Sequence, residues 1–174
     1  LIDGTLLHYG GKQLMYDDYE FNIDETKILF MCDVESIYRR SYSAKYYLFD
    51  MVTKKLSPLD EKHEPQTLAE YSPDGKMVSY IHGNDLFIKN VASGEVKKIT
   101  QDGKKNKIIN GTTDWVYEEE FAITKAYGWS PDSKQIAFLK FNEKEVKEFN
   151  LSFYGSLYPV NYKYKYPKAG EANS

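Results

Sequence analysis

Hydrophobic and polar residues alternate along this chain in many short runs, and three of these runs resemble one another. They read "FNIDETKILF" at 21–30, "YSPDGKMVSY" at 71–80 and "WSPDSKQIAF" at 129–138. Each begins with an aromatic residue, has Asp in fourth place and ends in an apolar run. Ser-Pro-Asp-Gly is typical of a turn, because Pro restricts φ, Asp bonds to nearby backbone and Gly accepts a positive φ. The pattern predicts a turn followed by an inner strand in each segment.

The residues between these segments predict further short strands. "HGND" at 82–85 is typical of a hairpin turn between strands at 77–81 and 86–91. A turn and another strand follow at 91–100, and the segment 46–59 is the counterpart after the first repeat. Several short strands in units of about 50 residues are typical of β-propeller blades, which bury their faces against one another.

Chain length limits how many blades are present. At about 45–50 residues per blade, 174 residues make roughly three to four blades, and propellers typically need at least four to close. We therefore predict an all-β fold, an incomplete β-propeller in which residues 1–174 are part of a larger propeller domain. An ordinary β-sandwich with coincidental Ser-Pro-Asp turns is the alternative.

Composition narrows the function classes. Aromatic residues make up 16% of the chain, which suits the half-buried surface of a pleated sheet. No apolar run approaches the roughly 18–20 residues of a membrane helix, so we expect no membrane span in this chain. A net charge of −3 without a basic cluster argues against a nucleic-acid partner. A lone cysteine, Cys32, and three histidines without ligand spacing predict neither a metal nor a cofactor.

Near the C-terminus, Tyr162, Tyr164 and Tyr166 alternate with Lys163 and Lys165. Alternation with a period of two predicts a strand with one packed face and one solvated face. Lysines on the solvated face also discourage association between strand edges. We assign no binding role to this strand.

An acidic segment, "NGTTDWVYEEEF" at 110–121, interrupts the third repeat. Asn-Gly marks a turn, and either Thr113 or Asp114 can serve as the N-cap of a short helix. The segment therefore predicts a short helical insertion near 114–121. Four side chains are expected to hold this helix against the propeller: Trp115, Val116, Tyr117 and Phe121.

Three adjacent carboxylates repel one another, so folding alone gives little reason to place them together. Neighbouring helical positions point about 100° apart, so Glu119 and Glu120 can flank one small cation. The alternative is a solvated acidic face, which composition alone favours.

Several motifs together point to one family. "DWVYEEEF" at 114–121 is followed by "GWSPDS", "FNEKEV", "LSFY" and "YPKAG". This series closely resembles the N-terminal propeller domain of the dipeptidyl peptidase IV family, within the prolyl oligopeptidase family of serine peptidases. The similarity covers about residues 20–170 and is most specific at the acidic motif. "EEEF", without a longer aliphatic continuation, looks more like bacterial members than mammalian ones.

The resemblance also implies which residues bind substrate. The family's paired glutamates fall on Glu119 and Glu120, whereas Glu118 is not a binding partner in the family pattern. "RRSYSAKYYLFD" at 39–50 resembles the family segment with a substrate-contacting arginine, which falls on Arg39. No catalytic residue and no metal ligand is implied in this chain.

Members of this family release dipeptides from peptide N-termini, preferring Pro or Ala in second position. A free N-terminus is an ammonium with a pKa of about 7.7–8.0, which two carboxylates can hold through charge-assisted hydrogen bonds. Anchoring the first residue would place the bond after the second one at the nucleophile, while Arg39 would hold a backbone carbonyl. The implied partners are peptides with a free N-terminus and a second copy in a homodimer of the full-length protein. The implied location is the periplasm or the outside of the cell.

One departure from the family concerns catalysis. The family's nucleophilic serine lies in a Gly-x-Ser-x-Gly turn of a C-terminal α/β-hydrolase domain, and no such motif occurs in this sequence. We expect the catalytic domain to be absent from this chain, and the chain alone to be inactive. A non-catalytic propeller that serves as a protein-interaction platform is the alternative, because a fold does not imply a function.

Overall fold

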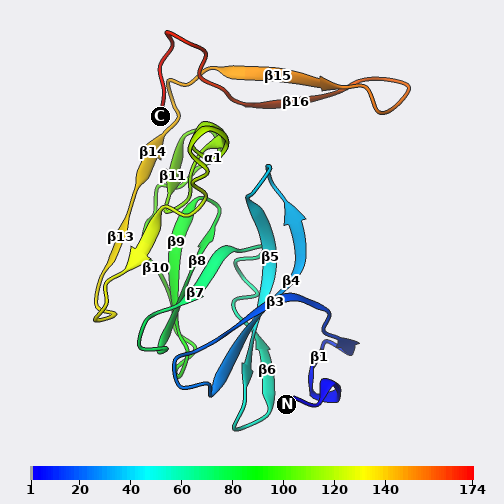
Figure 1. Cartoon of the computed structure of the whole chain (residues 1–174), viewed down its shortest axis with the longest axis vertical. Helices are drawn as coiled ribbons and strands as arrows, with labels where there is room; N and C mark the ends of the chain where they lie inside the picture. Colours follow the sequence, from blue (N-terminus) through cyan, green and yellow to red (C-terminus); the bar gives the residue numbers. More distant parts are fainter. Residues whose placement is uncertain (1) are drawn as a thin grey trace.

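The computed structural model describes residues 2–174, and strands dominate its regular structure (Figure 1). A 3-10 turn at Gly4–Leu6 and a hairpin of β1 (His8–Tyr9) and β2 (Lys12–Gln13) come first. An antiparallel sheet in the order β3-β4-β5-β6 follows. Its strands are Tyr16–Phe21, Lys27–Ser36, Tyr42–Asp50 and Lys55–Pro58.

A second four-stranded antiparallel sheet has the order β10-β9-β8-β7. Its strands, from β7 to β10, are Thr67–Tyr71, Met77–His82, Asp85–Asn90 and Val96–Lys98. Each of the two sheets thus consists of four strands consecutive in sequence, with each strand beside its neighbour in the chain. This meander is the topology of a propeller blade.

The third group of strands is paired two by two. β11 (Ile108–Asn110) pairs with β14 (Lys140–Asn142), and β12 (Tyr127–Trp129) pairs with β13 (Ile136–Phe138). Helix α1 (Trp115–Phe121) lies between β11 and β12 in the chain. A final antiparallel ribbon, β15 (Glu148–Phe153) with β16 (Val160–Lys165), extends across one end of the molecule (Figure 1).

All three sequence repeats form the predicted turn, but the inner strand expected after each turn is present only twice. β4 and β8 lie inside four-stranded sheets, whereas β13 pairs only with β12 among the described residues and is largely exposed. Each turn begins at the second residue of its repeat, which is Asn22, Ser72 or Ser130. The fourth residue of the turn donates its N–H to the carbonyl of the first, at 2.8–3.0 Å. The fourth residues have positive φ, and they are Glu25, Gly75 and Ser133. The Asp in third place accepts the N–H two residues further on, at 3.1–3.2 Å. Strands β4, β8 and β13 then begin within a few residues.

The hairpin predicted at 82–85 is confirmed as well. It joins β8 to β9, with His82 opposite Asp85. Gly83 and Asn84 have φ of 58° and 67°. Positive φ at both central residues is what a two-residue hairpin loop with the normal strand twist requires.

Apolar side chains between facing sheets form the core. One cluster joins the first and second sheets, and it includes Leu29, Tyr46, Leu48, Val78, Tyr80 and Phe87. Another joins the second sheet to β12 through Ile81, Leu86 and Tyr127. Each sheet therefore buries a face against the next one, as propeller blades do. The all-β fold and the short helix near 114–121 are confirmed.

The tip of the β4–β5 hairpin and α1 lie at the same end of the sheets (Figure 1). The hairpin tip, residues 37–41, is a tight loop in which Ile37 N–H donates to the carbonyl of Ser41 at 2.9 Å. This arrangement brings two regions that are far apart in the sequence to one place.

Candidate substrate-binding site

Helix α1 begins at a side-chain cap. Asp114 has extended backbone angles, and its carboxylate accepts the N–H of Tyr117 at 3.1 Å. Of the two N-caps that the sequence allows, the structure therefore uses Asp114. The helix ends at Ala122, whose left-handed conformation lets its N–H return to the carbonyl of Glu118.

Aromatic side chains hold α1 from two directions. Tyr117 packs against the cluster of Ile109, Ala126 and Phe141, with its ring centroid 4.8 Å from that of Phe141. On the other side Trp115 lies 4.8 Å from Tyr166, which follows β16. These contacts fix where the three glutamates of α1 lie.

Phe121 does not brace the helix as the sequence predicted. Its side chain is 62% exposed, and its only ring contact within residues 2–174 is with Tyr117 of the same helix, at 5.5 Å. Phe121 lies one turn after Tyr117 on the same face but is the last residue of the helix, and the cluster of Ile109, Ala126 and Phe141 contacts Tyr117 and not Phe121. The expectation that all four apolar residues anchor the helix is therefore wrong at Phe121.

The three consecutive glutamates have different surroundings. Glu118 is 1% exposed, the side chain of Glu119 is 15% exposed, and Glu120 faces solvent. Steps of about 100° between helical neighbours explain how adjacent carboxylates reach different environments. The run is therefore only partly a solvated acidic face.

Arg39 and Glu119, 80 residues apart in the sequence, form an ion pair. Nε of Arg39 lies 2.9 Å from Oε2 and 3.3 Å from Oε1 of Glu119. The arginine side chain is 71% exposed. Among the described residues, 2–174, this carboxylate is the only hydrogen-bond partner of the Arg39 guanidinium. Its Nη groups are consequently free to donate to another acceptor.

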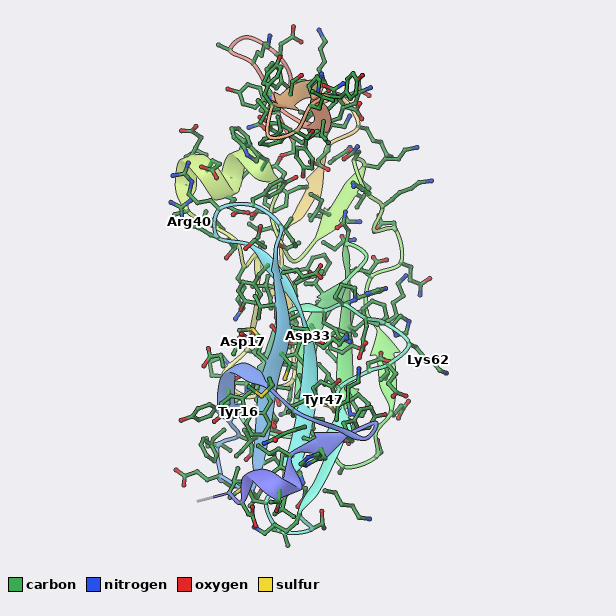
Figure 2. The ribbon with its side chains drawn as sticks, turned by 90° about the vertical axis from the view of Figure 1, so that its right-hand side faces the viewer. Tyr16, Asp17, Asp33, Arg40, Tyr47 and Lys62 are labelled. Carbon is green, nitrogen blue, oxygen red and sulfur yellow. The ribbon has the colours of Figure 1, made fainter. Side chains whose placement is uncertain are left out.

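Glu118 makes a second link between the same two regions. Its Oε1 accepts the backbone N–H of Arg40 at 2.6 Å and that of Ser41 at 2.8 Å. Nη1 of Arg40 donates to the carbonyl oxygen of Glu118 at 3.0 Å. Figure 2 shows Arg40 at the tip of the β4–β5 hairpin, beside α1.

Sequence reasoning did not find this link. A usable signal was present, because Glu118 lies one helical turn after Trp115 and Asp114 and so belongs to the packed side of the helix. The partner loop could not be read from the sequence in the same way. Its backbone N–H groups exist at every non-proline position and have no residue-type signature.

Beside the loop and the helix lies a cavity of about 690 Å³. Its wall includes Arg40, Ser41, Asp114 and Glu143. Arg39, Glu119 and Glu120 are not part of this wall in the described chain. None of the three predicted binding residues therefore lines the cavity, although Arg40, the next residue after Arg39, does.

Glu143, in the wall of this cavity, has surroundings that are unfavourable to a charged carboxylate. Burial raises its pKa to about 7, and the carboxylate of Asp114 adds to the effect. Lys165 opposes the shift. At pH values below about 7 Glu143 therefore carries a proton, so it adds no charge to the acidic site.

Metal sites and membrane spans have their own structural requirements. Nowhere in residues 2–174 do three or more His, Cys, Asp or Glu side chains gather as metal ligands do. In the same part of the chain, no helix has both the length and the apolar character required to cross a membrane.

Comparison with protein families identifies the chain. The model of the dipeptidyl peptidase IV (DPP IV) N-terminal region matches residues 22–174. The chain belongs to the dipeptidyl peptidase IV family. This result confirms the resemblance seen in the acidic motif and in the segments that follow it.

Individual relatives agree with the family assignment. Dipeptidyl peptidase 4 of Bos taurus is 37% identical over 90% of this chain, and prolyl endopeptidase FAP of Mus musculus is 34% identical over 93%. Dipeptidyl peptidase 4 of Porphyromonas gingivalis, a crystal structure, is 41% identical over 91% of this chain, with a TM-score of 0.85. This DPP IV-type chain spans about a fifth of the length of these relatives, at 21%, 22% and 23% respectively.

The match to a solved dipeptidyl peptidase 4 also confirms the incomplete propeller, because the superposition covers nearly the whole chain. The three residues expected to bind substrate in this DPP IV-family chain lie together. Arg39 contacts Glu119, and Glu120 is next to Glu119 on the same helix.

Proposed function

We propose that this chain is the substrate-recognition part of a serine dipeptidyl aminopeptidase. Glu119 and Glu120 bind the N-terminal ammonium of a peptide, and Arg39 holds a backbone carbonyl of the bound dipeptide. The observation that supports this most directly is the Arg39–Glu119 contact at 2.9 Å, formed by residues 80 positions apart. A solvated acidic face alone would need no such partner.

The chemistry suits a free N-terminus. An ammonium has three N–H donors and one charge, so two carboxylates can share it. Glu119 is partly screened from water, whereas Glu120 is exposed and able to turn toward a ligand. An internal peptide segment has no such charge, so the pair selects chain ends.

Selection of chain ends also sets the length of the product. With the ammonium held at Glu119 and Glu120, the second peptide bond lies at a constant distance from the anchor. The free Nη groups of Arg39 donate to a carbonyl of the bound dipeptide and fix its orientation. A nucleophile placed at that distance therefore releases dipeptides. The preference for Pro or Ala as the second residue is proposed from the family resemblance.

Magnitudes favour a paired site over a lone carboxylate. An exposed ion pair is typically worth only about 0–1 kcal/mol. In a partly enclosed site, a hydrogen bond to a charged group is worth about 1.5–3 kcal/mol. The loss of both carboxylates should therefore lower catalytic efficiency by about two to four powers of ten, at about 1.4 kcal/mol per tenfold.

The reaction itself requires residues that this chain does not contain. We propose that a C-terminal α/β-hydrolase domain of the full-length protein supplies the nucleophilic serine and its partners. The homodimer of the full-length protein stays a prediction.

The direct test is the double substitution Glu119→Gln/Glu120→Gln in the full-length protein. We expect kcat/KM on a dipeptidyl chromogenic substrate to fall by about two to four powers of ten, because neutral amides cannot pair with the ammonium. The thermal unfolding midpoint should change little. A matched control is Glu25→Gln/Glu95→Gln, which neutralises two exposed glutamates in turns. Unchanged kinetics in the Glu119/Glu120 variant would end this proposal.

A further inference from the structure

The buried carboxylate of Glu118 is a part of the site region to which the binding chemistry assigns no task. It is 1% exposed and makes its hydrogen bonds to the main chain of the hairpin tip, residues 37–41. The donors are 77 and 78 residues away in the sequence. A buried charge is unfavourable unless it is well hydrogen-bonded, and these two N–H groups offset the cost of burying the carboxylate.

The positions of the donors show what these bonds hold in place. Arg40 directly follows Arg39, and Glu118 directly precedes Glu119. The bond from the N–H of Arg40 to Glu118 therefore joins the two residues that adjoin the Arg39–Glu119 pair. Since consecutive Cα atoms are only about 3.8 Å apart, a shift at the Arg40–Glu118 hydrogen bond also shifts Arg39 and Glu119.

The guanidinium of Arg40 makes a further hydrogen bond between the loop and α1. Its Nη1 donates to the carbonyl oxygen of Glu118, while the Glu118 side chain receives the N–H of Arg40. The two residues thus exchange hydrogen bonds in both directions. This reciprocal pairing restrains the orientation of the loop relative to α1 more than one bond would.

We propose that Glu118 is a positioning residue for the amine-binding site. Its carboxylate fixes the tip of the β4–β5 hairpin against α1, so that Arg39 and Glu119 stay in register for substrate. The proposal rests on the function proposed above for Arg39, Glu119 and Glu120. Glu118 itself does not touch substrate in this scheme.

Coupling between Glu118 and Arg39 separates positioning from a general effect on stability. In the full-length protein we expect Glu118→Ala to lower kcat/KM on a dipeptidyl p-nitroanilide by about tenfold or more. In an Arg39→Ala background the same change should cost less than about threefold, because the residue that it positions is already absent. An equal loss in both backgrounds would overturn the proposal, as would wild-type kinetics for Glu118→Ala.

A milder variant keeps the test decisive if Glu118→Ala does not fold. Glu118→Gln retains a carbonyl oxygen at the position that accepts both N–H groups but loses the charge. We expect a smaller loss of kcat/KM that again depends on the presence of Arg39. A loss of the same size with and without Arg39 would refute positioning.

Hydrogen exchange provides a readout that does not depend on peptidase activity. In the full-length protein, the amides of Arg40 and Ser41 should exchange at least about tenfold faster in Glu118→Ala than in the wild type. The Glu119→Gln/Glu120→Gln variant should leave their exchange unchanged. If exchange rises in Glu118→Ala while the Glu119/Glu120 variant has normal kinetics, Glu118 does hold the hairpin tip against α1, but the proposed function fails. If exchange and kinetics both stay normal in Glu118→Ala, positioning alone fails.

Asp60→Ala is the matched control for both measurements. Asp60 is also a buried carboxylate that accepts a backbone N–H, that of Lys62 at 3.0 Å. Its other partners are His63 and Tyr80, which are outside the hairpin tip and α1. Its loss should lower stability without changing the exchange of Arg40 and Ser41.

Discussion

At the scale of single residues, the three glutamates of the acidic run, Glu118, Glu119 and Glu120, make different contacts. Glu118 faces the protein and bonds to main-chain N–H groups, Glu119 pairs with Arg39, and Glu120 faces solvent. Mutual repulsion among the three is reduced because their carboxylates point to different surroundings. The three identical residues therefore comprise one structural acid and two acids that we propose bind substrate.

Glu143 provides a pH-dependent prediction at this scale. Burial is the main reason that its folded-state pKa is raised from 4.5 to about 7. The folded state then binds more protons than the unfolded state between these pH values, so its stability falls as pH rises through that window. The stability associated with the neutral form is fully present below about pH 4.5 and is lost above about pH 7.

We therefore expect Glu143→Gln to stabilise the full-length protein by about 1–3 kcal/mol at pH 8 and to change little at pH 5. Thermal unfolding midpoints at the two pH values measure the difference. Glu145→Gln, at an exposed position two residues away, is the control. Equal shifts for Glu143→Gln at both pH values would contradict burial of an ionisable carboxyl as the cause.

At the scale of elements, α1 depends on its surroundings. A helix of seven residues is too short to be stable by itself in water. The Asp114 cap and the ring contacts of Trp115 and Tyr117 supply what the helix lacks. The order of the proposed binding residues on α1 therefore depends on these contacts.

Two aromatic residues of α1 give a matched pair of variants. Tyr117→Ala should lower the free energy of unfolding by about 2 kcal/mol, because it removes a ring packed on Phe141 and Ile109. Phe121→Ala should change stability by less than about 0.5 kcal/mol, since that ring is mostly exposed. Chemical denaturation of the full-length protein compares the two. Equal losses would show that α1 is anchored differently.

The β15–β16 ribbon is another element defined by few contacts. Within the described chain its strands pair only with each other. Tyr164 and Tyr166 contact Trp115 of α1, and Phe149 packs against Tyr166. The strand predicted from the Tyr–Lys alternation is present as β16. Only Tyr164 of the alternating tyrosines is buried, so the packed face is shorter than the alternation predicts.

At the scale of the whole molecule, the candidate site depends on packing between sheets. Arg39 comes from the hairpin tip of the first sheet, whereas Glu119 belongs to an insertion among the strands that follow the second sheet. The core clusters between the sheets therefore determine how far apart these residues lie. Damage to that core should affect the site even when no site residue changes.

The division between recognition and catalysis gives a prediction at this scale. The chain alone should release no dipeptide from a dipeptidyl p-nitroanilide, whereas the full-length protein should do so. The reason is that a Gly-x-Ser-x-Gly turn, followed by Asp and His, is expected in the part of the protein outside this chain. Replacing that serine by Ala should abolish the release. A full-length protein without the serine would instead support a non-catalytic interaction platform.

Much of the fold was predictable because its signals are local. The three Asp-containing turns, the Gly83–Asn84 hairpin and a helix cap at Thr113 or Asp114 all follow from contacts within a few residues, and the structure then selects Asp114 as the cap. The packing of α1 was predicted less well. Phe121 fits an apolar anchor by type and spacing, yet its exposure depends on how far along the helix the packed cluster of Ile109, Ala126 and Phe141 reaches.

By itself, the sequence determined the strands, the repeat, the short helix and, through its motifs, the family. Only the tertiary structure decided that Glu118 is buried at the hairpin tip and that Arg39 meets Glu119. The physical reason is the separation along the sequence over which each interaction acts. Turn and strand preferences act between near neighbours, whereas contacts across 77–80 residues exist only after the sheets have packed and set the distance between their loops.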